Sequence, residues 1–258
     1  MRAASHSGQS GSSSRALVTR PAYDRAGHPT HAATVAAMSG PYGPAGSGYA
    51  VVPDSGSGPG VLVLHAWWGL TPFFKDLCDH LADAGFVALA PDLHGENLTA
   101  DTPDEAEALL ASTDPNRTAN LVVGAISTLR SMPATPPGRI GILGFSMGGS
   151  WALWAAARFP DDVAAVSVYY GSQDVDFSPA EAAFQGHFAE IDEFESEDDV
   201  AYLEAQLRLA GHQTEFHRYP GTGHWFAESD RPAAYDQAAA DIAWDRTLAF
   251  LHTQLDHH

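Results

Sequence analysis

Short apolar runs alternate with longer amphipathic stretches along the chain from Tyr49 onward. Six runs are predicted to be strands: Val61–Leu64, Phe86–Ala90, Ile140–Phe145, Ala164–Tyr169, Phe188–Ile191 and Glu215–Tyr219. Most of these runs are continuously apolar, as in strands that a parallel sheet buries on both faces. Strands that alternate with helices predict βαβ crossovers. The pattern therefore predicts one α/β domain with a mostly parallel, doubly wound sheet flanked by helices.

The segments between the strands carry helix signals. Helices are predicted over these segments: Pro72–Ala84, Asp114–Ser131, Met147–Phe159, Asp198–Ala210 and Pro232–Leu255. Gly85 and Gly211 follow two of them as C-terminal stops. Asp114 followed by Pro115 is a typical helix start, because the aspartate can cap the first turn and proline fits its first position.

The first 45 residues differ from the rest in composition. They are rich in Ser, Gly, Ala and His and lack periodicity, so residues 1–45 are predicted to be a disordered extension and residues 46–258 the folded domain. An over-extended gene model beginning before Met38 and a functional arm both fit this segment. It contains no apolar core of a secretion signal, so we expect a cytoplasmic protein.

The charge balance narrows the possible partners. The chain has 13 basic and 32 acidic residues, a net charge of −19. Such a surface repels phosphate backbones and anionic membranes, so neither nucleic acid nor a membrane is an expected partner. The single cysteine, Cys78, excludes a disulfide within the chain and is predicted to be a small core residue. Metal-binding patterns such as His-Glu-x-x-His and Cys-x-x-Cys are missing, so no metal is expected.

A nucleophile motif stands at the end of the third predicted strand. Gly144-Phe145-Ser146-Met147-Gly148 has the form G-x-S-x-G, with an apolar run before it and an apolar helix after it. This strand–turn–helix context is typical of a nucleophile elbow. The two glycines are needed because a Cβ at either position would collide with neighbouring backbone. Ser146 is predicted to stand at the carboxyl edge of the sheet, at a helix N-terminus that favours negative charge.

A serine needs a base, and the base needs a partner that orients it. His224, in "RYPGTGHWFAE", follows the last strand and a glycine-rich turn, so it can reach Ser146 over the sheet edge. Several acids compete for the third role. Asp192 closes the preceding strand run and is our prediction, while Asp174, which follows the strand before that, remains the alternative.

The tandem tryptophans of "HAWWG" follow the first long buried strand. Acyl transfer needs two N–H donors aimed at the developing oxyanion. One is predicted to be the backbone N–H of Met147, and the other that of Trp67. The rings of Trp67 and Trp68 can then diverge, one to the pocket wall and one to the core.

With these motifs, residues 46–255 resemble the dienelactone hydrolase family of α/β hydrolases. The resemblance rests on "VLVLHAWWGL", "LADAGFVALAPDL", "GILGFSMGG", "YYG", "HFAEIDEF" and "YPGTGHWFAE". It implies a triad of Ser146, Asp192 and His224, and an oxyanion hole from Trp67 and Met147.

The chain departs from the family pattern in three places. Dienelactone hydrolases use a cysteine nucleophile where this chain has Ser146, and they carry a glutamate where this chain has Ala66. The two changes are consistent, because that glutamate serves the resting thiol. The family also binds a substrate carboxylate through arginines, and one of those positions is Glu228 here. A carboxylate-bearing lactone is therefore not the expected substrate.

These observations predict a serine hydrolase of carboxylic esters or lactones that needs no cofactor and acts as a monomer or small homo-oligomer. An aromatic pocket for neutral, fairly apolar small molecules is predicted from these rings, although core packing explains each of them equally well: Trp67, Trp68, Phe194, Trp225 and Phe226. Alternatives on the same fold are a thioesterase, a peptidase, a cofactor-free haloperoxidase or a non-catalytic binding protein, because fold does not settle function.

Overall fold

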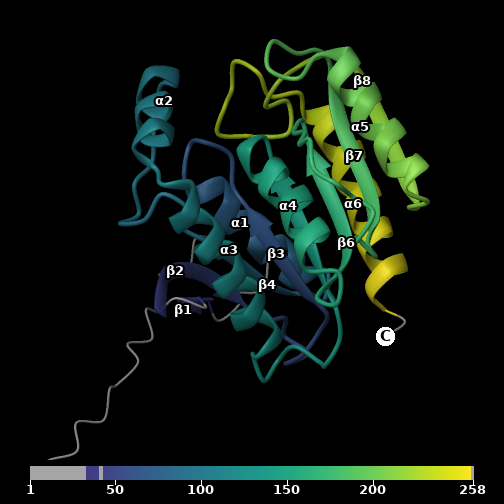
Figure 1. Ribbon diagram of the computed structural model, residues 1–258. Coiled ribbons are helices and arrows are strands. Elements are labelled where there is room, and N and C mark those ends of the chain that lie inside the picture. The colour runs from purple at the N-terminus through teal and green to yellow at the C-terminus, as the bar shows by residue number, and fades with distance from the viewer. Residues whose placement is uncertain (1–32, 41–42, 257–258) are drawn as a thin grey trace, which may run out of the picture.

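An eight-stranded sheet forms the centre of the molecule (Figure 1). The structure is a computed structural model and describes residues 33–40 and 43–256. The strand order across the sheet is β1-β2-β4-β3-β5-β6-β7-β8. The strands are β1 (Ala33–Gly40), β2 (Gly43–Val51), β3 (Gly60–Leu64), β4 (Val87–Pro91), β5 (Ile140–Phe145), β6 (Val163–Tyr169), β7 (Ala183–Ile191) and β8 (Thr214–Gly223). Strands β3 to β8 are parallel to one another, whereas β1 pairs with β2, and β2 with β4, in antiparallel fashion.

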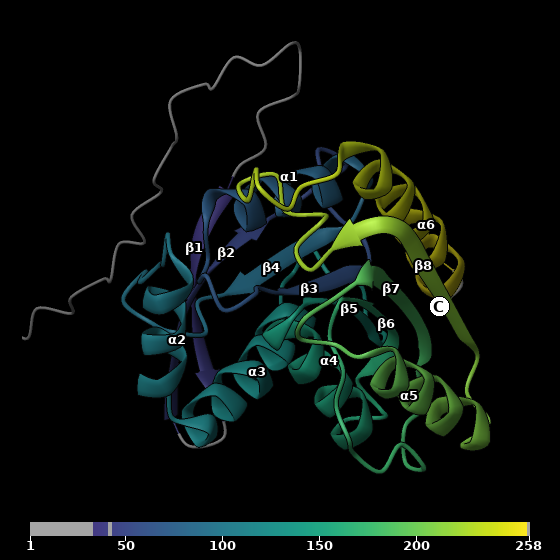
Figure 2. The same cartoon turned by 90° about the horizontal axis from the view of Figure 1, so that it is seen from above.

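Helices cover both faces of the sheet. They are α1 (Pro72–Asp83), α2 (Pro103–Ser112), α3 (Pro115–Arg130), α4 (Met147–Arg158), α5 (Glu197–Leu209) and α6 (Gln237–Leu255). Helices α1 and α6 lie on one face and α3, α4 and α5 on the other, as the view from above shows (Figure 2). The predicted doubly wound α/β domain is confirmed, because the continuously apolar strands β3, β4, β5 and β6 are buried along their whole length.

Three elements differ from the sequence prediction. Helix α2 was not predicted, although Thr102 and Glu105 form a capping box at its start. Helix α6 begins at Gln237 rather than Pro232, because the carboxylate of Asp236 accepts the N–H of Ala239 and caps the helix there. Strand β7 begins five residues before the predicted Phe188.

The predicted boundary at residue 45 is wrong for the residues of this segment that the structure describes. Strands β1 and β2 pair along their whole length, from Ala33 opposite Val51 to Gly40 opposite Gly43, and β2 continues the sheet through β4. Backbone pairing holds this hairpin in place, and Met38 is buried in the core on the α3 side of the sheet. Residues 1–32, which belong to the same predicted extension, lie outside the described residues.

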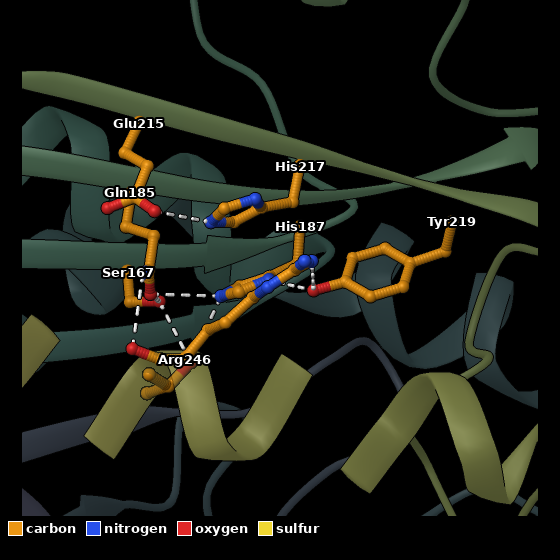
Figure 3. Close-up of polar contacts among 8 residues, drawn as sticks. Ser167, Gln185, His187, Glu215, His217, Tyr219 and Arg246 are labelled. Atoms are coloured by element: carbon orange, nitrogen blue, oxygen red, sulfur yellow. Dashed lines mark hydrogen bonds and ion pairs between the residues drawn. The ribbon is translucent and has the colours of Figure 1, made fainter. Parts of the chain in front are cut away.

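A buried polar cluster joins β6, β7 and β8 to α6 (Figure 3). At its centre His187 contacts the hydroxyl of Tyr219 through Nδ1 at 2.7 Å, and both Gln185 Oε1 and Thr247 Oγ1 through Nε2 at 3.0 Å. The amide oxygen can only accept, so Nε2 carries the proton and Nδ1 accepts from Tyr219. Ser167 also donates to Gln185 Oε1. Every polar atom of the His187 ring is therefore satisfied inside the core.

The single cysteine lies in the interior, as the sequence predicts. Cys78 is buried as a free thiol, and its burial raises its pKa, in line with a core role. Within the described ranges, no three His, Cys, Asp or Glu side chains are grouped as metal ligands would be, and no helix there is long and apolar enough to span a membrane.

Candidate active site

Ser146 forms the turn between β5 and α4 and has an unusual backbone conformation. Its φ of 49° and ψ of −117° lie in a region that residues other than glycine rarely occupy, at a cost of about 1–3 kcal/mol. The N–H of Ser146 donates to the carbonyl of Tyr169 at 2.9 Å, which ties the turn to the neighbouring strand β6. The predicted strand–turn–helix setting is confirmed.

The two glycines of the motif allow the turn to pack against its surroundings. A Cβ at Gly144 would lie 2.4 Å from the carbonyl oxygen of Gly148, and a Cβ at Gly148 would lie 2.1 Å from that of Leu64. Both distances are far below van der Waals contact. The first turn of α4 therefore lies directly against the end of β3, which begins the loop that carries Trp67.

Sheet register brings the other two predicted residues together. Ile191 of β7 is opposite Gly223 of β8, so the next residue of each strand, Asp192 and His224, emerges at the same height. Both follow the carboxyl ends of parallel strands, as Ser146 does. In Figure 1 the loop that carries His224 is the yellow segment after β8 at the top of the view.

Ser146, His224 and Asp192 form a continuous hydrogen-bonded chain. His224 Nε2 lies 2.9 Å from Ser146 Oγ, and Nδ1 lies 2.9 and 2.8 Å from the two carboxylate oxygens of Asp192. A carboxylate only accepts, so Nδ1 donates and Nε2 is left to accept the serine proton. The side chains of His224 and Asp192 are each 4% exposed. The alternative acid, Asp174, is exposed and accepts a hydrogen bond from Gln206 instead.

The carboxyl group of Asp192 is held in its charged form. Burial opposes ionisation, but the hydrogen bond and the charge of His224 and the N–H groups of Phe194 and Glu195 together outweigh it, and the pKa of Asp192 lies below its usual value. The two N–H groups donate to Oδ1 at 2.9 and 3.1 Å. Asp192 can therefore orient His224 and stabilise the imidazolium that forms when His224 takes a proton.

The loop after β3 is fixed by two histidines. His94 Nε2 donates to the carbonyl of Trp67 at 2.8 Å. His65 Nδ1 donates to the carbonyl of Ala66, and its Nε2 accepts the N–H of Leu93. Burial lowers the pKa of His65 to about 3, so the ring is neutral and acts as a fixed spacer. These contacts hold the backbone of the loop from His65 to Trp67, and the start of this loop lies against Gly148 in the first turn of α4.

Three of the predicted pocket rings gather over the site. Trp67 stacks on Trp225 with ring centroids 5.8 Å apart, and Phe194 contacts both rings. The Phe194 and Trp225 rings also lie 4.8 and 4.9 Å from the His224 ring. These three residues form a partly exposed aromatic wall, which we call the aromatic rim.

The other two rings pack in the core. Trp68 is buried, and the guanidinium of Arg231 lies 3.9 Å above its ring. Phe226 is fully buried between Tyr170 and Tyr219, so its prediction as a pocket residue is wrong. Trp225 has a positive φ of 65°, and this turn directs consecutive side chains to the rim and to the core.

Two residues that contact the site, Tyr170 and His94, were not predicted to belong to it. Tyr170 lies in the quoted "YYG" and packs its ring against His224 at 4.8 Å. Its hydroxyl donates to the buried carboxyl group of Glu228 at 2.9 Å. His94 is also new. His94 could have been suggested by its position shortly after a predicted strand. No local pattern indicates that Tyr170 and Glu228 are in contact.

Comparison with known proteins identifies the family of the chain. Residues 47–255 match the model of the dienelactone hydrolase family. The chain is 35% identical to protein usf of Aquifex pyrophilus over 81% of this chain and 93% of that protein. It is 33% identical to carboxymethylenebutenolidase 1 of Cupriavidus pinatubonensis over 77% and 88% of the two chains.

The fold is also found among solved structures. A dienelactone hydrolase-like promiscuous phosphotriesterase from metagenomic libraries superposes with a TM-score of 0.78 at 18% identity, over 87% of this chain and 99% of that one. At this identity the likeness concerns the fold alone, that of the α/β hydrolases. The family match and the two relatives go further: the chain belongs to the dienelactone hydrolase family, a family of carboxylic ester hydrolases.

Proposed function

We propose that this protein hydrolyses carboxylic esters or lactones through an acyl-enzyme formed on Ser146. The observation that carries the proposal is the unbroken hydrogen-bonded chain from Asp192 through His224 to the Ser146 hydroxyl. Membership of the dienelactone hydrolase family supports it, as does the relative named as a carboxymethylenebutenolidase.

The proposed reaction has two stages. Ser146 Oγ attacks the carbonyl carbon while His224 Nε2 takes the hydroxyl proton, and Asp192 stabilises the imidazolium. His224 then gives this proton to the leaving oxygen, which departs as an alcohol or, in a lactone, stays attached to the acyl chain. In the second stage a water molecule gives its proton to His224 and attacks the acyl carbon. The carboxylic acid leaves as Ser146 recovers its proton.

The oxyanion of each tetrahedral intermediate is assigned to two backbone N–H groups. Met147 begins α4, where the N–H groups of the first turn have no partner within the helix. Trp67 supplies the second N–H from the loop that packs against that turn, and His94 holds the loop through the Trp67 carbonyl. A preorganised donor of this kind contributes on the order of 10²–10³ in rate.

Neutral substrates fit the surroundings of Ser146 better than anionic ones. The aromatic rim of Trp67, Phe194 and Trp225 offers apolar contact. Asp192 places negative charge next to His224, the whole chain carries a net charge of −19, and Glu228 stands where the family has an arginine. The negative field of the protein repels a substrate carboxylate, and Glu228 supplies no positive charge that could bind one.

A fluorophosphonate probe tests the proposal directly, because it reacts with an activated serine. We expect the wild type to be labelled and Ser146→Ala to remain unlabelled. Ser150→Ala is the matched control, since Ser150 lies one turn further along α4 and donates to the carbonyl of Ser172. Labelling that survives in Ser146→Ala, or that is lost equally in both variants, would contradict the assignment.

A substrate panel then separates the ester hydrolase from the same fold with other chemistry. Nitrophenyl acetate, a matched thioester, a simple lactone and a peptide amide are compared by kcat/KM. The proposal expects Ser146-dependent hydrolysis of the ester and the lactone. A clear preference for the thioester or the amide would overturn it in favour of a thioesterase or a peptidase.

A further inference from the structure

The turn that carries His224 also carries a carboxyl group that the proposed reaction does not use. The N–H of Phe226 donates to the carbonyl of Gly223, and the N–H of Glu228 donates to that of Trp225. These bonds wind residues 223–228 into a tight turn. His224 and Glu228 are therefore held at a fixed separation on one short segment.

Glu228 is fully buried and only half satisfied. Its Oε1 accepts the hydroxyl of Tyr170 at 2.9 Å, whereas its Oε2 is shielded from solvent and has no hydrogen-bond partner within the described structure. Arg231 is nearby, but its guanidinium lies over Trp68 and donates to the carbonyls of Ala100 and Asp101. A buried carboxylate without a paired cation is costly, which favours the protonated acid.

Burial is the main influence on the ionisation of Glu228. Together with Asp230 on the same turn it outweighs the Tyr170 hydrogen bond and Arg231, which act in the opposite direction, and the pKa of Glu228 is raised to about 8. Tyr170 comes from the end of β6, and its own pKa is raised well above the usual value by burial and by Glu228, so its hydroxyl keeps its proton. At neutral pH both partners are therefore uncharged.

Tyr170 connects this carboxyl group to the reacting histidine. The Tyr170 ring is fully buried and lies 4.8 Å from the His224 imidazole and 5.5 Å from Phe226. Tyr170 has a positive φ of 39°, and its N–H donates to the carbonyl of His187 at 2.8 Å, which fixes its backbone directly after β6. His224 and Glu228 are therefore connected in two ways: through the ring and hydroxyl of Tyr170, and through the backbone of the turn that they share.

We propose that Glu228 is a positioning residue: by holding the hydroxyl of Tyr170 it fixes the ring against which His224 rests. This inference depends on the proposed function, because it assigns Glu228 to the reaction at Ser146. When Glu228 loses its proton above about pH 8, its Oε1 still accepts from Tyr170, but an unpaired negative charge is then buried on the turn that carries His224, and the turn has to shift to solvate this charge. The rate at Ser146 should then fall.

Two variants separate positioning from plain stability. Glu228→Ala removes the partner of Tyr170, and we expect kcat to fall about 10- to 100-fold with KM within about twofold, because small displacements of a reacting group cost rate rather than binding. Glu228→Gln still accepts from Tyr170 but cannot ionise. It should restore most of the lost kcat at pH 7 and abolish the decline in rate that the wild type shows near pH 8.

The matched control is Glu193→Gln, which removes an exposed carboxylate next to Asp192. It should keep the wild-type pH profile. The proposal is overturned if Glu228→Ala behaves like the control, or if Glu228→Gln declines near pH 8 as the wild type does. If Glu228→Ala does not fold, Tyr170→Phe replaces it, since it removes the same hydrogen bond and leaves the ring.

The rate of Ser146 labelling by the fluorophosphonate probe, followed from pH 6 to 10, keeps the two proposals distinguishable. A wild type that is labelled but shows no decline near pH 8 overturns the role of Glu228 alone. A wild type that is never labelled overturns the proposed function. In that case the ¹⁵N resonances of the His224 ring still test the positioning role of Glu228. A shift of these resonances in Glu228→Ala that is reversed in Glu228→Gln supports this role, and unchanged resonances overturn it.

Discussion

His224 and His187 are two buried histidines, the first just after β8 and the second within β7, and each uses both ring nitrogens. His224 donates from Nδ1 to the carboxylate of Asp192 and accepts at Nε2 from Ser146. His187 accepts at Nδ1 from Tyr219 and donates from Nε2 to Gln185 and Thr247. The main chemical difference lies in the group that accepts the ring N–H: a carboxylate for His224, and the uncharged Gln185 and Thr247 for His187.

This difference decides which ring can work as a base. A base must be stable in its protonated form for part of the reaction, and a carboxylate stabilises the imidazolium where an amide does not. The pKa of His187 lies well below its usual value, because burial, the neighbouring His217 and Arg246 all oppose its positive charge. His187 is thus a neutral connector between the sheet and α6, whereas His224 is equipped for proton transfer.

The carboxylate partner should account for the largest effect. Replacing Asp192 by Asn keeps the shape but removes the charge and disturbs the tautomer of His224, so we expect kcat to fall roughly 10³- to 10⁴-fold. Asp174→Asn is the matched control, because Asp174 is exposed and bonds only to Gln206 among the contacts the structure records. Steady-state hydrolysis of nitrophenyl acetate measures both. Equal losses in the two variants would contradict the assignment of the acid.

Exchanging the two histidines for alanine should separate activity from stability. His187→Ala removes one hydrogen bond each from Gln185, Thr247 and Tyr219 and opens a cavity, so the free energy of unfolding should drop by about 3 kcal/mol. Its kcat/KM per folded molecule should stay within about twofold, since no reacting atom is touched. His224→Ala should instead lower kcat/KM strongly and change the free energy of unfolding little. Urea unfolding and ester hydrolysis give the two numbers, and a His187→Ala enzyme that is stable but inactive would contradict this division.

The neutral state of the buried His187 should also make the stability of the folded protein depend on pH. The folded-state pKa of His187 is lowered, so the folded protein binds fewer protons than the unfolded chain below pH 6.5. Its contribution to stability is complete above pH 6.5 and is lost as the pH falls, by up to about 1.4 kcal/mol per pH unit. His65 adds a second slope of this sign between pH 6.5 and about 3.

His187→Gln removes one of these slopes while keeping a polar side chain. The free energy of unfolding, measured in urea at pH 7, 6 and 5, should therefore decline less steeply in His187→Gln than in the wild type. A variant with the wild-type slope would show that His187 becomes protonated in the folded state without cost.

The three residues of the predicted triad could be found from their local sequence context. Ser146, Asp192 and His224 each follow an apolar strand, and parallel strands bring their carboxyl ends to one edge. The start of β7 was missed because Gln185 and His187 interrupt the apolar run. In the core His187 contacts Thr247, which is 60 residues away in the chain, and no local sequence pattern predicts this contact.

Other misses have similar physical causes. The hairpin of β1 and β2 is held by backbone pairing between residues of low hydrophobicity, so periodicity did not indicate it. Trp225 and Phe226 are chemically alike, and the sequence does not tell which ring lies beside His224 and which is buried in the core; Trp225 adopts a positive φ of 65° that no local pattern predicted. Helix α2 was locally predictable from its capping box at Thr102 and Glu105.

The smallest expected effect concerns access to His224, the other respect in which the two histidines differ. His187 is sealed on all sides, whereas the His224 ring is covered by Phe194, a side chain that is 52% exposed. Phe194→Ala removes part of the aromatic rim but none of the reacting groups, so KM for a phenyl ester should rise about 3- to 10-fold with kcat within about twofold.

The control for this variant is Ile191→Ala, an apolar side chain that is 66% exposed just before Asp192. It should leave KM unchanged if the rim, rather than general surface hydrophobicity, receives the substrate. A Phe194→Ala enzyme with unchanged KM and reduced kcat would instead mean that the ring steadies His224 in the way proposed for Tyr170. The split between KM and kcat therefore decides whether the exposed side of His224 is a binding surface or a second support.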